Sequence, residues 1–110
     1  MKYQHKKLAA GRWQDLSLME QMANIGSEVE RTISWRDKNN NLYSQQAFIR
    51  ALELLDLTIS ISKKYPRIRE LTRLREVLVD YFFGENQYAS SDKLWRNYFN
   101  AFNYGARINT

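Results

Sequence analysis

Apolar residues recur every three or four positions along almost the whole chain, and this spacing limits the fold more than any other feature of the sequence. Residues three or four positions apart lie on the same face of a helix, so the pattern predicts amphipathic helices. The alternation typical of half-buried strands is missing, and the 110 residues include only one proline and four glycines. The sequence therefore predicts an all-α fold.

Turn and capping signals divide this pattern into four helices. They are predicted to begin near Asp15 to Ser17, near Ser44, at Pro66 and after Ser91. Ser17 and Glu20 have the spacing of a capping box, and an asparagine run at 39–41 is expected to end the first helix. Loops of roughly five to eight residues favour antiparallel neighbours. We therefore expect residues 15–110 to form an up-down-up-down antiparallel four-helix bundle.

The apolar stripe of each helix predicts the core. It comprises Leu18, Met22, Ile25, Val29 and Ile33 on the first helix, Phe48, Leu52, Leu55 and Ile59 on the second, Ile68, Leu71, Leu74, Leu78, Tyr81 and Phe82 on the third, and Trp95, Tyr98, Phe99, Phe102 and Ala106 on the fourth. Gly26, beside the first stripe, marks either a close approach of two helices or a tolerated glycine that costs about 1 kcal/mol. Residues 1–14 are either a short extra helix, packed by Leu8 and Trp13, or a basic arm.

The composition excludes several chemistries. The chain has no cysteine and a single histidine, His5, so thiolate sites, a paired Glu-x-x-His di-iron site and histidine-activated nucleophiles are not expected. Neither phosphate-binding glycine motif occurs, and no apolar run is long enough to span a bilayer. These absences predict a cytoplasmic protein without a cofactor.

Two carboxylates remain as catalytic candidates. Glu53 and Asp56 lie three positions apart on the narrow polar wedge of the second helix, where a third oxygen ligand would complete a divalent-metal site. The alternative is an acidic strip that pairs with arginines of a neighbouring helix, which is the more common role of such a pair.

A polar stripe on the last helix is the first of three faces that packing does not explain. Arg96, Asn100, Asn103 and Arg107 share one face of that helix without an acid between them, and Tyr104 lies at the edge of the stripe. Guanidinium and carboxamide groups bind phosphate oxygens or exposed bases, and a tyrosine ring adds a stacking surface. The alternative is a solvated face, or one paired with Glu53 and Asp56.

The other two faces are candidates for a protein interface. Asn24, Glu28, Arg31 and Trp35 point away from the first apolar stripe, and a tryptophan beside an arginine is typical of an interface anchor. Alternatively, Trp35 covers the loop near Leu42 and Tyr43. Val79 and Phe83 lie off the main stripe of the third helix. They form a second apolar seam for the N-terminal segment or for another subunit.

The basic charge of the chain favours an acidic partner. The net charge is +5 and the isoelectric point lies near 9.6. Basic residues gather in an N-terminal arm, at Lys2, Lys6, Lys7 and Arg12, and again between Lys63 and Arg75. By helical phase, Arg69 and Arg73 share their face with Glu76 and Asp80, which predicts a mixed-charge surface.

Parts of the chain resemble known families. Residues 5–13, 20–29, 50–58 and 79–82, which read HKKLAAGRW, EQMANIGSEV, RALELLDLT and VDYF, resemble a family of small hypothetical cytosolic proteins of prokaryotes with no known activity. Arg96-Asn97 is similar, more weakly, to the Arg-Asn of the active helix in HEPN ribonucleases. Ala101 stands where those enzymes have histidine, so this resemblance implies at best a binding relative without nuclease chemistry.

The function predicted first is that of a non-enzymatic module for protein interaction or for self-association as a homodimer, through the Trp35 face and the Val79–Phe83 seam. The alternative is RNA or DNA binding through the stripe of the last helix. A carboxylate- and metal-dependent enzyme comes third.

Overall fold

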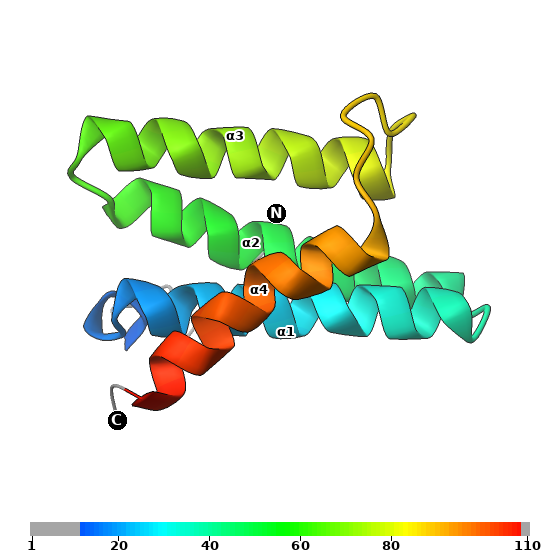
Figure 1. The fold of residues 1–110 in the computed structure, drawn as a ribbon, viewed down its shortest axis with the longest axis horizontal. Coiled ribbons are helices and arrows are strands. Elements are labelled where there is room, and N and C mark those ends of the chain that lie inside the picture. Colours follow the sequence, from blue (N-terminus) through cyan, green and yellow to red (C-terminus); the bar gives the residue numbers. More distant parts are fainter. Residues whose placement is uncertain (1–11, 109–110) are drawn as a thin grey trace.

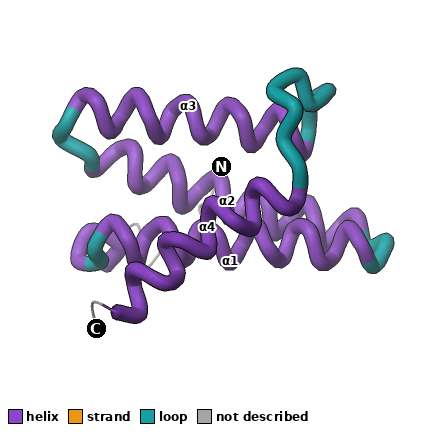
Figure 2. Tube along the Cα trace, in the orientation of Figure 1, coloured by secondary structure: helices purple, strands orange, loops and turns teal. Residues whose placement is uncertain are grey.

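The computed structural model describes residues 12–108 of the chain. The described part comprises a short 3₁₀ turn and four helices, namely η2 (Trp13–Asp15), α1 (Leu18–Asp37), α2 (Asn41–Ile61), α3 (Tyr65–Phe82) and α4 (Asp92–Ile108). α1 packs against α2 and α4, and α3 packs along α2 (Figure 1). Short turns join the first three helices, and a longer loop leads from α3 to α4 (Figure 2). The predicted all-α fold of four helices with antiparallel contacts is confirmed.

Local side-chain caps explain where the first two helices begin. The Ser17 hydroxyl accepts the Glu20 N–H at 3.1 Å, and the Glu20 carboxylate accepts the Ser17 N–H at 3.0 Å, which confirms the capping box. The Asn40 side chain accepts the Tyr43 N–H at 3.0 Å, so α2 begins at Asn41. The prediction of a start near Ser44 was therefore too late, because the asparagine run supplies a cap as well as a turn.

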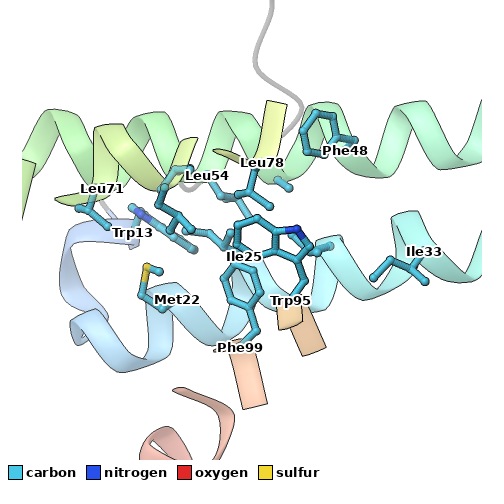
Figure 3. Packing of buried hydrophobic residues seen from close by; sticks show 14 residues of the cluster. Trp13, Met22, Ile25, Ile33, Phe48, Leu54, Leu71, Leu78, Trp95 and Phe99 are labelled. Carbon is cyan, nitrogen blue, oxygen red and sulfur yellow. The ribbon is translucent and has the colours of Figure 1, made fainter. Parts of the chain in front are cut away.

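The core joins all four helices. Met22, Ile25 and Ile33 of α1 meet Phe48 and Leu54 of α2, while α3 contributes leucines and α4 contributes aromatic rings (Figure 3). Buried leucines of α3 are Leu71, Leu74 and Leu78, and buried rings of α4 are Trp95 and Phe99. The remaining residues predicted for the cores of these two helices are only partly buried, and most of them pack against the edge of the buried cluster.

The N-terminal segment contributes Trp13 to this core. Its side chain is 2% exposed, and its Nε1 donates to Oγ1 of Thr58 on α2 at 3.0 Å. Leu8 and the arm lysines Lys2, Lys6 and Lys7 lie outside the described residues. The division at residue 14 therefore stays a prediction. Among residues 12–108, no helix combines the length and the apolar character needed to cross a membrane.

Candidate binding groove between α1 and α4

α4 approaches α1 closely at Gly26. A Cβ atom added to Gly26 would lie 2.7 Å from Cβ of Phe99, which is too close for two carbon atoms. A Cβ atom added to Gly105 of α4 would lie 3.0 Å from the sulfur of Met19, a tight contact that this flexible side chain can relieve. Gly26 lets the helices approach one another, so the interpretation of Gly26 as the mark of a close helix contact is confirmed.

A groove of about 330 Å³ lies along this contact. Its buried lining is apolar and consists of Gly26, Val29, Ile33, Trp95 and Phe99. Its exposed lining is polar and consists of Ser27, Glu30, Arg31, Arg96, Asn100 and Asn103. An apolar interior with a few polar groups around it is typical of a binding site.

Three residues of the predicted polar stripe line the groove, namely Arg96, Asn100 and Asn103. The side chains of Asn100 and Asn103 make no hydrogen bond to any other residue in the range 12–108. Each carboxamide therefore presents a donor and an acceptor to a ligand. Tyr104 and Arg107 are exposed on the same helix but do not line the groove.

α1 places an acid against the stripe. Nε of Arg96 donates to the two carboxylate oxygens of Glu30 at 3.0 and 3.3 Å, and this hydrogen bonding raises the pKa of Arg96. The alternative in which the stripe pairs with Glu53 and Asp56 is wrong for Arg96, which pairs with Glu30 because α4 packs against α1. The stripe is free of acids on its own helix but not in the folded protein.

The face predicted around Trp35 is largely satisfied within the fold. Glu28 is buried, with oxygens 2.7 Å from Nη1 of Arg31 and 3.0 Å from Nε of Arg50. The expectation that Glu28 points away from the core is wrong, because α2 covers that side of α1 and brings Arg50 to it. Asn24 donates to the backbone carbonyl of Glu20 at 2.8 Å.

Trp35 itself contacts the start of α2. Its ring lies edge-on to the Tyr43 ring, with centroids 4.9 Å apart, and Nζ of Lys38 lies 5.1 Å from the Trp35 centroid. The predicted contact of Trp35 with Tyr43 is therefore present, but Tyr43 lies in the first turn of α2 and not in a loop, and Leu42 is exposed.

The seam predicted on α3 divides into a covered and an exposed residue. Val79 is partly buried against the core, whereas Phe83 is 53% exposed, with its ring 4.8 Å from that of Phe48. Phe83 also lines a smaller depression of about 240 Å³ beside the start of α2. Phe83 is therefore the one member of the seam that is available to a second molecule.

The two candidate catalytic carboxylates, Glu53 and Asp56, differ in their surroundings. Asp56 accepts from Nε of Arg75 on α3 at 2.7 Å, as the alternative to a metal site predicted. Glu53, placed by the sequence pattern on the narrow polar wedge of the second helix, is buried. No group of three or more potential metal-ligating side chains occurs in the part of the chain that the structure describes.

A network that the sequence did not reveal joins three helices. Asp92, at the start of α4, accepts from Arg36 of α1 and, at 2.6 Å, from the hydroxyl of Tyr81 on α3. Burial raises the pKa of the Asp92 carboxyl, but hydrogen bonds from Arg36 and Tyr81 outweigh it, so the pKa lies below its ordinary value. Burial and the bond to Asp92 raise the pKa of Tyr81. The only sequence signal was an acid at a helix start, which helix-dipole arguments already explain.

The fold and the groove define a small all-helical protein with a concave surface between two helices. Comparison of the chain with protein-family models, curated proteins and solved structures finds no match. The resemblance to a family of small prokaryotic proteins therefore stays a prediction.

Proposed function

We propose that the protein is a non-enzymatic interaction module whose α1–α4 groove binds an extended segment of a partner protein. The observation that carries the proposal is that Asn100 and Asn103, whose side chains make no hydrogen bond to other residues in the range 12–108, line the groove together with buried apolar residues.

The groove has the chemistry that a peptide requires. A peptide backbone presents N–H donors and C=O acceptors, and each carboxamide can satisfy one of each. The apolar lining formed by Val29, Trp95 and Phe99 can receive one side chain of the segment.

The charges of the groove favour a peptide over a nucleic acid. Glu30 lies against Arg96 and would repel phosphate groups, whereas a peptide can match both signs of charge. An acidic residue of the partner would compete with Glu30 for Arg96, at a low cost because both side chains are substantially exposed. We therefore place nucleic-acid binding through this stripe second.

Self-association remains a prediction in its own right. Trp35 and Val79 are only partly exposed, whereas Phe83 is 53% exposed although its ring contacts Phe48, so Phe83 would be the main contact of a dimer. A sedimentation experiment over a range of concentrations measures this directly, and Phe83→Ser should weaken any dimer that forms through the seam.

The peptide proposal is tested by selection from a library of random short peptides on the purified protein. The peptides that emerge are then titrated by calorimetry against wild type, Asn100→Ala/Asn103→Ala and Asn97→Ala. We expect the double variant to bind roughly 10- to 30-fold more weakly, since it loses two hydrogen-bonding side chains worth about 1 kcal/mol each.

Asn97 provides the matched control, because it is an exposed asparagine of α4 that does not line the groove. Its replacement should leave the affinity unchanged. Equal binding by all three proteins, or the absence of any selected peptide, would contradict the proposal.

A further inference from the structure

Among residues 12–108, the positive charges without a carboxylate partner are concentrated on α3 and the turn before it. Six of the seven charged residues between Lys63 and Arg75 are basic. Only Arg75 of these six pairs with a carboxylate within residues 12–108. The remaining five are Lys63, Lys64, Arg67, Arg69 and Arg73, all of them exposed.

Two tyrosine rings accompany these charges. Tyr65, Arg69 and Arg73 follow one another at four-residue spacing, so they share one face of α3. The guanidinium carbon of Arg69 lies 5.8 Å from the Tyr65 centroid, and that of Arg73 lies 4.8 Å from the Tyr88 centroid. The surface formed by Tyr65, Arg69, Arg73 and Tyr88 is named here the Tyr–Arg face.

Two acids on this side of α3, Glu76 and Asp80, form hydrogen bonds with the loop before α4 and not with the arginines. The two Asp80 carboxylate oxygens accept the backbone N–H groups of Gln87 and Tyr88 at 2.9 and 3.0 Å. Glu76 accepts from the Tyr88 hydroxyl at 3.2 Å. The two acids of the expected mixed-charge surface therefore fix the position of the Tyr88 ring. The N–H donors of Arg69 and Arg73 stay available to a ligand.

The loop that carries Tyr88 is itself well ordered by hydrogen bonds. The Asn86 side chain donates to the carbonyl of Ser90 at 3.0 Å and accepts its N–H at 2.8 Å. Asn86 and Ala89 have positive φ angles of 56° and 54°, a conformation that such bonds must hold in place. Tyr88 is thus presented in a set position before any ligand arrives.

We infer that the Tyr–Arg face binds single-stranded nucleic acid. Arginines contact the phosphates, and the exposed Tyr65 ring and the fixed Tyr88 ring stack on bases. The guanidinium group of Arg69 can also stack on a base. From Tyr65 to Arg73 the helix rises about 12 Å, which is the length of three or four stacked nucleotides at roughly 3.4 Å each.

Ring stacking distinguishes this ligand from other polyanions. A duplex keeps its bases stacked internally, and an inorganic polyphosphate or an anionic membrane surface has no bases. Glu70 and Glu76 also line the depression along this face, which lowers its affinity for anions held by charge alone. The inference does not depend on the α1–α4 groove, since the two surfaces share no lining residue.

The test is fluorescence anisotropy with the full chain and a labelled single-stranded RNA of mixed sequence, at about 50 and 200 mM salt. Arg69→Ala/Arg73→Ala should bind roughly tenfold more weakly at low salt. It should also reduce the slope of log affinity against log salt by about 1.4, or about 0.7 for each lost phosphate contact. The charge-matched control is Lys38→Ala/Lys93→Ala, which removes two exposed lysines outside the Tyr–Arg face and should bind as wild type does.

Tyr65 tests the stacking. Tyr65→Ala should weaken binding by roughly 5- to 100-fold, whereas Tyr65→Phe should keep it within about twofold because the ring is retained. Unchanged circular dichroism and unfolding midpoints confirm that each variant is folded.

Several outcomes would overturn the inference. These are no RNA binding at low salt, equal loss in both arginine and lysine double variants, and a Tyr65→Ala variant that binds like wild type. Equally tight binding of duplex DNA, inorganic polyphosphate or phosphatidylserine vesicles would show a surface that recognises charge only, and would also reject it.

Discussion

The arginines of this protein are held in two different ways on two sides of the molecule. Arg31, Arg50 and Arg96 form ion pairs with carboxylates of α1. The pairs of Arg50 and Arg96 join α2 and α4 to α1, and the pair of Arg31 lies within α1. Arg69 and Arg73 on the outer side of α3 lie over tyrosine rings instead. A carboxylate uses the donors that an anionic ligand would need, whereas a ring leaves them free. Pairing, rather than the number of positive charges, therefore decides which surface can bind an anion.

Replacing Glu28 should have the largest effect on stability. Glu28→Ala removes the carboxylate shared by Arg31 and Arg50 and leaves Arg50, whose side chain is only 27% exposed, without its partner. We expect a loss of about 3 kcal/mol in the free energy of unfolding, measured by urea denaturation. Glu28→Gln, which keeps an acceptor, should lose less. A loss below about 1 kcal/mol for Glu28→Ala would show that the ion pairs of Glu28 with Arg31 and Arg50 contribute little to the free energy of unfolding.

Asp92→Asn should come next and should change the acid dependence of stability. At neutral pH we expect a loss of about 2 kcal/mol, because the bond from Arg36 loses its ionic acceptor. The folded-state pKa of Asp92 lies below the ordinary 3.8, so its contribution is present above that pH and disappears as the pH falls through the lower folded value. Denaturation curves from pH 7 to 2 should therefore decline less steeply for the variant than for wild type, and parallel curves would contradict this assignment.

Arg96→Ala should cost about 0.5 kcal/mol. Arg96 and Glu30 are 43% and 49% exposed at their side chains, so solvent weakens their attraction. Thermal unfolding at low and high salt measures the effect, which should shrink as salt rises. A loss well above 1 kcal/mol would make this pair part of the helix packing, and would weaken the proposal that a ligand can displace Glu30.

Arg69→Ala should have the smallest effect, at most about 0.5 kcal/mol, because the exposed Arg69 side chain contacts one tyrosine ring and pairs with no carboxylate among residues 12–108. The same urea denaturation that measures Glu28→Ala applies here. A large loss would mean that the Tyr–Arg face is structural, and the contrast between the two sides would disappear.

The helices were predictable because the interactions that form them are local. The capping box at Ser17 and the apolar stripes act over three or four residues, and both appeared as expected. The start of α2 was missed by three residues, since the side chain of Asn40 was interpreted as part of a turn and not as a cap.

The groove was predictable on one side only. Helical phase brought Arg96, Asn100 and Asn103 together on α4, because phase is a property of one helix. Ser27, Glu30 and Arg31 joined them only when α4 packed on α1, and Gly26 was the one residue that signalled the contact.

On α3, helical phase grouped the charged residues correctly but could not show which partners they bind. Phase correctly placed Arg69 and Arg73 with Glu76 and Asp80, but it could not show that both acids bind the loop around Tyr88. Charges that look neutralised along one helix are separated in the fold by the partners that other segments bring.

The sequence by itself determined four helices, the capping box that begins α1 and the apolar faces, because caps and helical periodicity depend on residues a few positions apart. The tertiary structure alone decided which charges are paired and where a concave surface forms. Arg96 and Glu30 are 66 positions apart, and no local pattern encodes the packing of α4 on α1 that brings them together.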